Sequence, residues 1–151
     1  MKLINAIISG IAGTALMTLF MYLLSYITKR RLKVVKILGT MLTIYSNPEG
    51  KLSESNKAIT IGLVTHYGVG IFFSICYLIL WRNGIGQPDL INACIFGLIN
   101  GVFGIFIWRL FLLIHPSPPF LPFKTYMASL VIGHVAFAIG IVYSFNFLSG
   151  I

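Results

Sequence analysis

Acidic residues are scarce in this chain: Asp and Glu together account for three of its 151 residues, and all charged residues for only 9%. A soluble globular domain typically carries about 25% charged residues. The three carboxylates, Glu49, Glu54 and Asp89, stand between the long apolar stretches, so no catalytic pair of carboxylates lies within those stretches. No Ser-His-Asp set and no H-E-x-x-H motif is present either. We therefore expect no enzymatic activity.

Cysteine is also rare, with Cys76 and Cys94 as its two occurrences. Both fall in the same half of the apolar runs described below. A disulfide between them is geometrically conceivable, but two buried thiols are the expectation. Because neither a cysteine nor a carboxylate shares the depth of the histidines in those runs, we expect no metal site and no bound cofactor.

Long apolar runs dominate what remains, since 58% of the residues are hydrophobic. About 20 consecutive apolar residues cross the hydrocarbon core of a bilayer. Membrane-spanning helices are predicted at about 3–27, 58–81, 90–114 and 124–148. Ser55 is the predicted N-cap of the second helix. The first run is longer than the roughly 7–15 apolar residues of a signal peptide, and no small-residue cleavage site follows it, so we expect it to be retained.

These runs predict one all-α fold, an integral membrane four-helix bundle with short loops that forms a single transmembrane domain over residues 1–151. The lipid bilayer is its expected partner. The net charge of +8 does not indicate nucleic-acid binding, because most of the basic residues lie in one loop, 28–57. By the positive-inside rule, this loop and the 115–123 loop are cytoplasmic, and both termini and the 82–89 loop are outside.

The segment after the first predicted helix, "KRRLKVVKILGTML", has an amphipathic pattern. Lys29, Lys33 and Lys36 recur on one helical face. The apolar positions opposite them are Leu32, Val35, Leu38 and Leu42. Two interpretations stay open: an interfacial helix with its lysines towards anionic lipid, or a cytoplasmic extension whose charges only fix the topology.

One polar residue in each predicted span falls at nearly the same depth. At 1.5 Å per residue, Thr14, His66, Asn100 and His134 all lie about 12–16 Å from the nearer end of their helices, close to the middle of a core about 30 Å thick. A lipid-facing imidazole would have no hydrogen-bond partner. We therefore expect these four side chains to face inward as one polar layer.

Small residues accompany this layer and are expected to let the helices approach closely, because lipid offers no hydrophobic reason for helices to associate. The predicted packing glycines are Gly10, Gly62, Gly70, Gly97, Gly101 and Gly133. Gly-xxx-Gly faces of this kind would also serve a homo-oligomer.

Three interpretations of the layer remain open. In the first, it holds the helices together through hydrogen bonds, and the protein's molecular role is unknown. In the second, it surrounds a cavity that binds or passes a small molecule or a proton, as in a small transporter or a proton-responsive channel component. In the third, His66 and His134 are the axial ligands of a haem in a haem-binding membrane subunit.

Residues 64 to 145 resemble the YagU-like family of bacterial inner-membrane proteins. Four short motifs occur in the family's order: Thr65-His66, Pro118-Pro119, Leu121-Pro122 and Gly133-His134. His66 and His134 match the two helix histidines of the family. The resemblance implies a multi-pass protein of the bacterial inner membrane and a link to acid resistance. It implies no established reaction.

Overall fold

The computed structural model describes residues 2–44 and 49–150, and its regular structure there is entirely helical. The helices are α1 (Lys2–Thr28), α2 (Val34–Leu42), α3 (Asn56–Arg82), α4 (Leu90–Ile114) and α5 (Phe123–Ser149). Four of them, α1, α3, α4 and α5, are long and apolar enough to cross a membrane. The predicted all-helical chain with four such helices is confirmed, and the helices begin and end within two residues of the predicted positions.

Capping residues explain where the long helices begin and end. Ser55 accepts a hydrogen bond from the backbone N–H of Ala58 (3.2 Å), as predicted, and α3 begins directly after it. Asp89 caps α4 in the same way, because its carboxylate accepts from the N–H of Asn92 (2.8 Å). Gly150 follows α5 in the left-handed region (φ 70°), which glycine adopts without steric cost.

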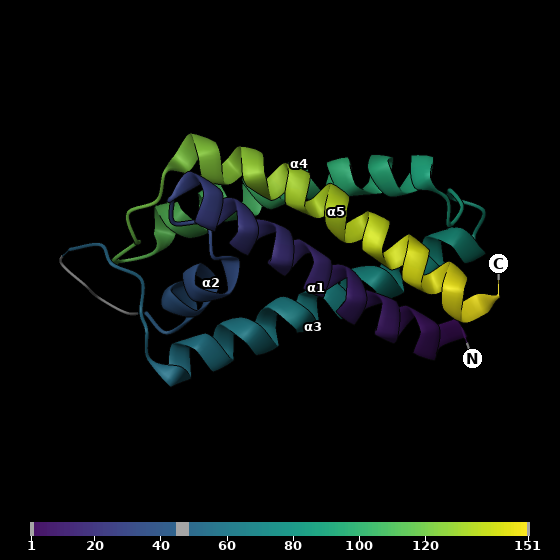
Figure 1. Cartoon of the computed structure of the whole chain (residues 1–151), viewed down its shortest axis with the longest axis horizontal. Coiled ribbons are helices and arrows are strands. Elements are labelled where there is room, and N and C mark those ends of the chain that lie inside the picture. The colour runs from purple at the N-terminus through teal and green to yellow at the C-terminus, as the bar shows by residue number, and fades with distance from the viewer. Residues whose placement is uncertain (1, 45–48, 151) are drawn as a thin grey trace.

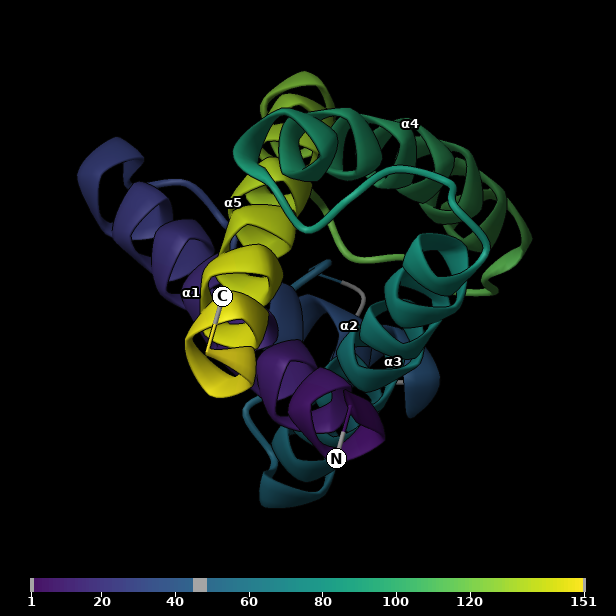
Figure 2. The same ribbon diagram turned by 90° about the vertical axis from the view of Figure 1, so that its right-hand side faces the viewer.

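The spanning helices are arranged in the order α3, α1, α5, α4. Helix α1 packs against both α3 and α5, and α5 packs against α4, whereas α3 and α4 pack sparsely against each other. Figure 2 shows α3 beside α1 and α4 beside α5. Both termini lie at one end of the bundle, here called the terminal end (Figure 1). The opposite end, here called the basic end, carries α2 and the segments that flank it.

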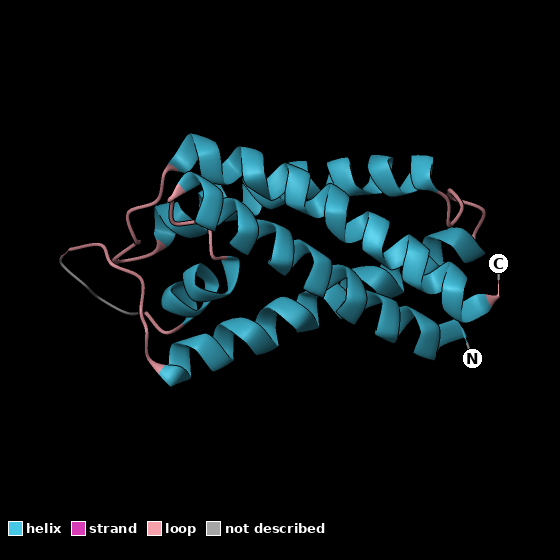
Figure 3. Cartoon of the chain, in the orientation of Figure 1, coloured by secondary structure: helices cyan, strands magenta, loops and turns pink. Residues whose placement is uncertain are grey.

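Helix α2 packs into the bundle instead of lying free on its surface (Figure 3). Its backbone reaches α3 because Gly39 lies against the carbonyl of Ala58, where a Cβ would not fit. The helix begins at Val34, so Lys29 and Lys33 of the predicted lysine face precede it and Lys36 lies within it. Two of the four apolar positions of the predicted amphipathic segment, Leu32 and Val35, are buried in the protein core. The apolar face of the predicted amphipathic segment therefore faces α3 and the interior.

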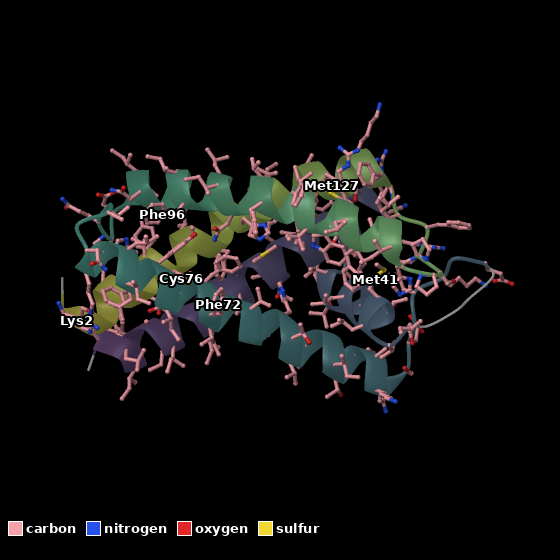
Figure 4. All side chains as sticks on the ribbon, turned by 180° about the vertical axis from the view of Figure 1, so that it is seen from behind. Lys2, Met41, Phe72, Cys76, Phe96 and Met127 are labelled. Carbon is pink, nitrogen blue, oxygen red and sulfur yellow. The ribbon has the colours of Figure 1, made fainter. Side chains whose placement is uncertain are left out.

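The outer surfaces of the long helices are apolar, as contact with lipid requires. Leu19 is 65% exposed, Phe106 65% and Phe147 86%. The buried side chains instead form a core that follows the length of the bundle. Figure 4 places Met41 and Met127 in the half nearer the basic end, far from Lys2 at the terminal end. The two cysteines, Cys76 and Cys94, are free and partly buried.

Candidate functional site

A cavity of about 240 Å³ lies between α3 and α4, where these two helices pack sparsely. Residues from all five helices line it, and both membrane histidines, His66 and His134, are among them. Most of the other lining residues are apolar or aromatic, including Phe73, Trp108 and Phe137. The cavity is therefore an apolar space with two imidazoles on its wall.

His66 is oriented by a threonine of α1. Its Nε2 lies 3.1 Å from Thr18 Oγ1, and that hydroxyl donates its own hydrogen to the carbonyl of Thr14 (2.7 Å). Since the hydroxyl hydrogen is already used, Oγ1 accepts and His66 Nε2–H donates. This tautomer leaves Nδ1 of His66 as an acceptor, and among the described residues no group donates to it.

His134 is oriented by its own helix. Its Nδ1 lies 2.8 Å from the carbonyl oxygen of Leu130, so Nδ1–H donates and Nε2 is the acceptor nitrogen. The ring packs against α4, because a Cβ placed on Gly104 would lie 3.1 Å from His134 Cε1. Within the part of the chain that the structure describes, Nε2 has no hydrogen-bond donor. Each histidine on the cavity wall thus keeps one acceptor nitrogen without a protein partner.

The predicted polar layer is only partly assembled. Thr14, His66 and His134 line the cavity, but Asn100 does not. Asn100 instead donates from Nδ2 to the hydroxyl of Tyr77 (2.8 Å), which joins α4 to α3. Asn100 lies four residues from Gly104, the residue that contacts His134, and this corresponds to about 6 Å along the helix towards the terminal end.

Thr14 also has a different partner from those expected. Its hydroxyl donates to the carbonyl of Gly10 in the same helix (2.7 Å), not to a histidine. The histidine partner on α1 is Thr18, one turn further along. Thr18 shares a face with Gly10 and Thr14 in the sequence, so its spacing was the signal that could have identified it.

Close approach of α1 and α3 depends on two of the predicted glycines. A Cβ on Gly10 would lie 2.7 Å from the Cα of Ile71, and a Cβ on Gly70 would overlap the hydroxyl of Thr14. Real Cβ atoms essentially never come within 3.0 Å of a backbone atom. The α1–α3 crossing therefore excludes a side chain at either position and fixes this wall of the cavity.

The other four predicted glycines lie at three different helix–helix contacts. Gly97 and Gly101 face α5, where a Cβ would lie 2.6 Å from Val135 Cα and 2.8 Å from Val131 Cα, respectively. Gly62 lies against the carbonyl of Val35 and admits α2. Gly133 differs, because a Cβ there would meet only side-chain atoms of two methionines at 3.4 Å, an ordinary contact distance.

Sequence reasoning missed the close crossing between α1 and α5. A Cβ on Gly13 would lie 2.6 Å from the carbonyl oxygen of Phe137, and one on Gly140 would lie 2.9 Å from Gly13 Cα. These two glycines face each other across the interface that holds the central pair of helices together. Their pairing depends on the relative rotation of α1 and α5, which no single-helix pattern contains.

His115 connects the α4–α5 turn to α2. The backbone N–H of Ser117 donates to its Nδ1 (3.1 Å), so Nε2 carries the hydrogen and donates to the carbonyl of Met41 (2.9 Å). The side chain is buried, with 7% of its surface exposed. The Met41 carbonyl, at the end of α2, also accepts from the backbone N–H of Ile44 (3.2 Å), so His115 is its second donor. It therefore holds α2 against the bundle.

Across residues 2–44 and 49–150, no three His, Cys, Asp or Glu side chains gather in a way that could hold a metal ion. No family model matches the chain, and no curated protein or solved structure matches it either. The length and apolar composition of α1, α3, α4 and α5 indicate a multi-pass membrane protein.

Proposed function

We propose that this multi-pass membrane protein binds a small, largely apolar molecule carrying hydrogen-bond donors, in the cavity between α3 and α4. One observation carries the proposal: His66 and His134 line a single apolar cavity, and each keeps an acceptor nitrogen that no described protein group satisfies. A hydroxyl or amine of a bound molecule would supply the missing donor. The aromatic walls would contact the rest of it.

The volume of the cavity limits the size of the molecule. About 240 Å³ is below the roughly 300–1,000 Å³ of sites for drug-sized ligands. This argues against the haem interpretation, as does the lack of any lysine or arginine in the cavity lining to hold propionates. A ligand about the size of a substituted benzene ring fits the volume better.

Interhelical hydrogen bonding alone explains half of the arrangement. The bond from His66 to Thr18 joins α3 to α1 and fits that interpretation. His134, however, bonds within its own helix and joins nothing by hydrogen bonding. Binding of a molecule accounts for both histidines. Whether the molecule also passes through, as in a transporter, is a further step that the same site would serve.

The location of the protein is part of the proposal. The basic end would face the cytoplasm, because of the concentration of lysine and arginine there, and the chain would belong to the bacterial inner membrane, as its resemblance to YagU-like proteins implies. The link to acid resistance and the homo-oligomer also stay predictions. Labelling of single cysteines introduced at Lys51 and Asn83 in intact cells and in inverted vesicles would test the orientation.

Tryptophan fluorescence offers a direct test of binding, because Trp108 lines the cavity and Trp81, the other of the two tryptophans, does not. In a Trp81→Phe background, 4-bromophenol should quench Trp108 saturably. Bromobenzene, which has the same ring without the hydroxyl, should quench it more weakly. His134→Leu should remove the difference between the two probes, and His134→Gln, which restores an acceptor, should keep it.

Two controls separate binding from structural effects. Thr18→Val breaks the bond to His66 but leaves the imidazole in place, so preference for the phenol should persist. Tyr143→Phe alters an exposed aromatic side chain outside the cavity lining and should leave both quenching curves unchanged. Equal, non-saturating quenching by both probes, or a preference unaffected by His134→Leu and His66→Leu, would contradict the proposed site.

A further inference from the structure

A second cavity, of about 930 Å³, lies at the basic end and is separate from the histidine cavity. It is formed by the last two turns of α1, the turn that follows, α2 and residues 51–54. Six basic side chains line it: Lys29, Arg30, Arg31, Lys33, Lys36 and Lys51. Among the described residues, the single carboxylate in the lining is Glu54. The cavity therefore has a strong excess of positive charge.

The nearby carboxylates neutralise only part of this charge. Glu54 forms an ion pair with Lys36 (2.7 Å), and Glu49 pairs with Lys51. Arg31 donates from Nη1 to the carbonyl of Gly50 (2.8 Å), a neutral acceptor that leaves its charge uncompensated. Two ion pairs against six cations leave an electropositive cavity, which attracts anions.

The arginines in the lining are held in position by neutral groups. Arg30 donates to the hydroxyl of Thr125 at the start of α5. Lys33 Nζ lies 5.9 Å from the ring centroid of Tyr22. These contacts place the basic groups without using a carboxylate. Such an arrangement suits a phosphate, whose oxygens accept charge-assisted hydrogen bonds from arginine and lysine.

The aromatic residues in the lining are of the kind that occurs at a membrane surface. Tyr22 and Tyr26 line it from the end of α1, and Tyr26 is 81% exposed. Tyrosine is enriched at the level of the lipid headgroups, where its ring contacts the acyl region and its hydroxyl contacts water. The phosphates of the surrounding lipids lie at the same level.

We propose that this basic cavity binds the phosphate group of an anionic phospholipid from the leaflet at the basic end. Basic pockets between membrane helices bind lipid headgroups of this kind, and the volume is ample for one. Helix α2 forms a wall of both cavities, with Lys33 and Lys36 of this region in the basic lining and Val34 and Leu38 in the histidine cavity. A bound headgroup would contact the helix that closes the histidine cavity.

The test uses the full chain in a neutral detergent and measures the lipid-induced rise in thermal stability. The probes are dioctanoyl phosphatidylglycerol, dioctanoyl phosphatidylcholine, glycerol phosphate and inorganic phosphate. We expect saturable stabilisation by the phosphatidylglycerol only. The double variant Lys29→Gln/Lys33→Gln should weaken this binding about thirtyfold, because each lysine near an anionic lipid contributes a factor of roughly five.

The matched control is Lys57→Gln/Lys124→Gln. It removes the same charge from the same end, at positions outside the cavity lining, and should leave lipid binding nearly unchanged. Lys29→Gln alone should give an intermediate loss. Equal weakening by the two double variants would mean general surface charge and would overturn the site. Equal effects of the two lipids would also overturn it. Equal stabilisation by inorganic phosphate would overturn the lipid as the source of the phosphate.

Discussion

Two glycines on α3 provide the sharpest test of the packing that shapes the histidine cavity. A Cβ on Gly70 would overlap Thr14 Oγ1 and would lie 3.3 Å from Phe137 Cε2, whereas a Cβ on Gly68 would meet nothing within 4 Å. Both residues lie in the same helix, two positions apart. Alanine at either position gains the same helix propensity, roughly 1 kcal/mol over glycine. The difference between the two substitutions therefore isolates the contact with α1.

The magnitude follows from the geometry. Inserting a methyl group into well-packed structure costs about 1–3 kcal/mol. We therefore expect Gly70→Ala to be about 1–3 kcal/mol less stable than Gly68→Ala, and Gly68→Ala itself to be neutral or slightly stabilising. The measurement is the free energy of unfolding in mixed micelles, followed by circular dichroism during titration with a denaturing detergent.

A double variant identifies the atom responsible. Thr14→Ala removes the overlapping hydroxyl, so a Cβ at position 70 would then meet the Cβ of residue 14 at 3.1 Å, a contact that small shifts relieve. Gly70→Ala combined with Thr14→Ala should recover most of the loss seen in Gly70→Ala alone. If Gly70→Ala is as stable as Gly68→Ala, or if the double variant recovers nothing, the α1–α3 crossing described above is wrong.

Further predictions concern single side chains. Tyr126→Phe should leave the free energy of unfolding unchanged or raise it, because the Tyr126 hydroxyl is buried with no hydrogen-bond partner among the described residues. Tyr77→Phe breaks the hydrogen bond between Tyr77 and Asn100 of α4 and should lower the free energy of unfolding by about 0.6–1.7 kcal/mol. His115→Phe should speed amide hydrogen exchange in α2 while the middle of α5 stays protected, because the bond that holds the end of α2 is lost; unchanged exchange would show that this bond contributes nothing. The hydrogen bond and the charge of Lys36 lower the pKa of Glu54 below its ordinary value. The pair therefore stabilises the fold at neutral pH, and this stabilisation is lost as the pH falls through the lowered pKa. Glu54→Gln should show a smaller loss of melting temperature on acidification, and identical pH profiles would refute the contribution.

The four long helices could be predicted from the sequence because a membrane-spanning helix is recognised by the length of its apolar run. A run of about 20 apolar residues is explained by a bilayer and by little else, and each of the four runs became a helix. The cap at Ser55 could be read as well, because an N-cap is a local hydrogen bond between residues three apart. Features that depend on one helix and its immediate neighbours along the chain could therefore be predicted from the sequence.

The surface against which α2 packs could not be predicted in the same way. Its apolar face, with Val35 and Leu38, has the same pattern whether it meets acyl chains or another helix, because both are apolar. In the structure α2 packs against α3, because Gly39 and Gly62 lack the side chains that would keep the two helices apart. Gly62 was recognised as a packing residue, but its partner on a different helix cannot be deduced from spacing.

The polar layer shows the limit of depth arithmetic. Counting 1.5 Å per residue assumes helices perpendicular to the membrane that start at the same level, and an error of one turn, about 5.4 Å, changes the partner. His66 consequently bonds Thr18 and not Thr14, and Asn100 lies outside the cavity. The two histidines still line one cavity because they lie on helices that both start at the basic end, so the same error applied to both.

Both acceptor nitrogens on the cavity wall bear on whether the site is functional. The acceptor nitrogens of His66 and His134 are not enclosed by protein atoms but face the cavity, and leaving a polar atom without a donor in an apolar space costs free energy. Leucine or phenylalanine would fill the same positions without that cost and would pack against Phe137 and Trp108. Helix association does not require the imidazole of His134, since its one hydrogen bond is to its own helix. The arrangement therefore favours a guest that donates to these nitrogens, and His134→Leu should raise the free energy of unfolding of the empty protein while weakening the binding of 4-bromophenol. A variant that lost both stability and binding would indicate instead that His134 is a packing residue.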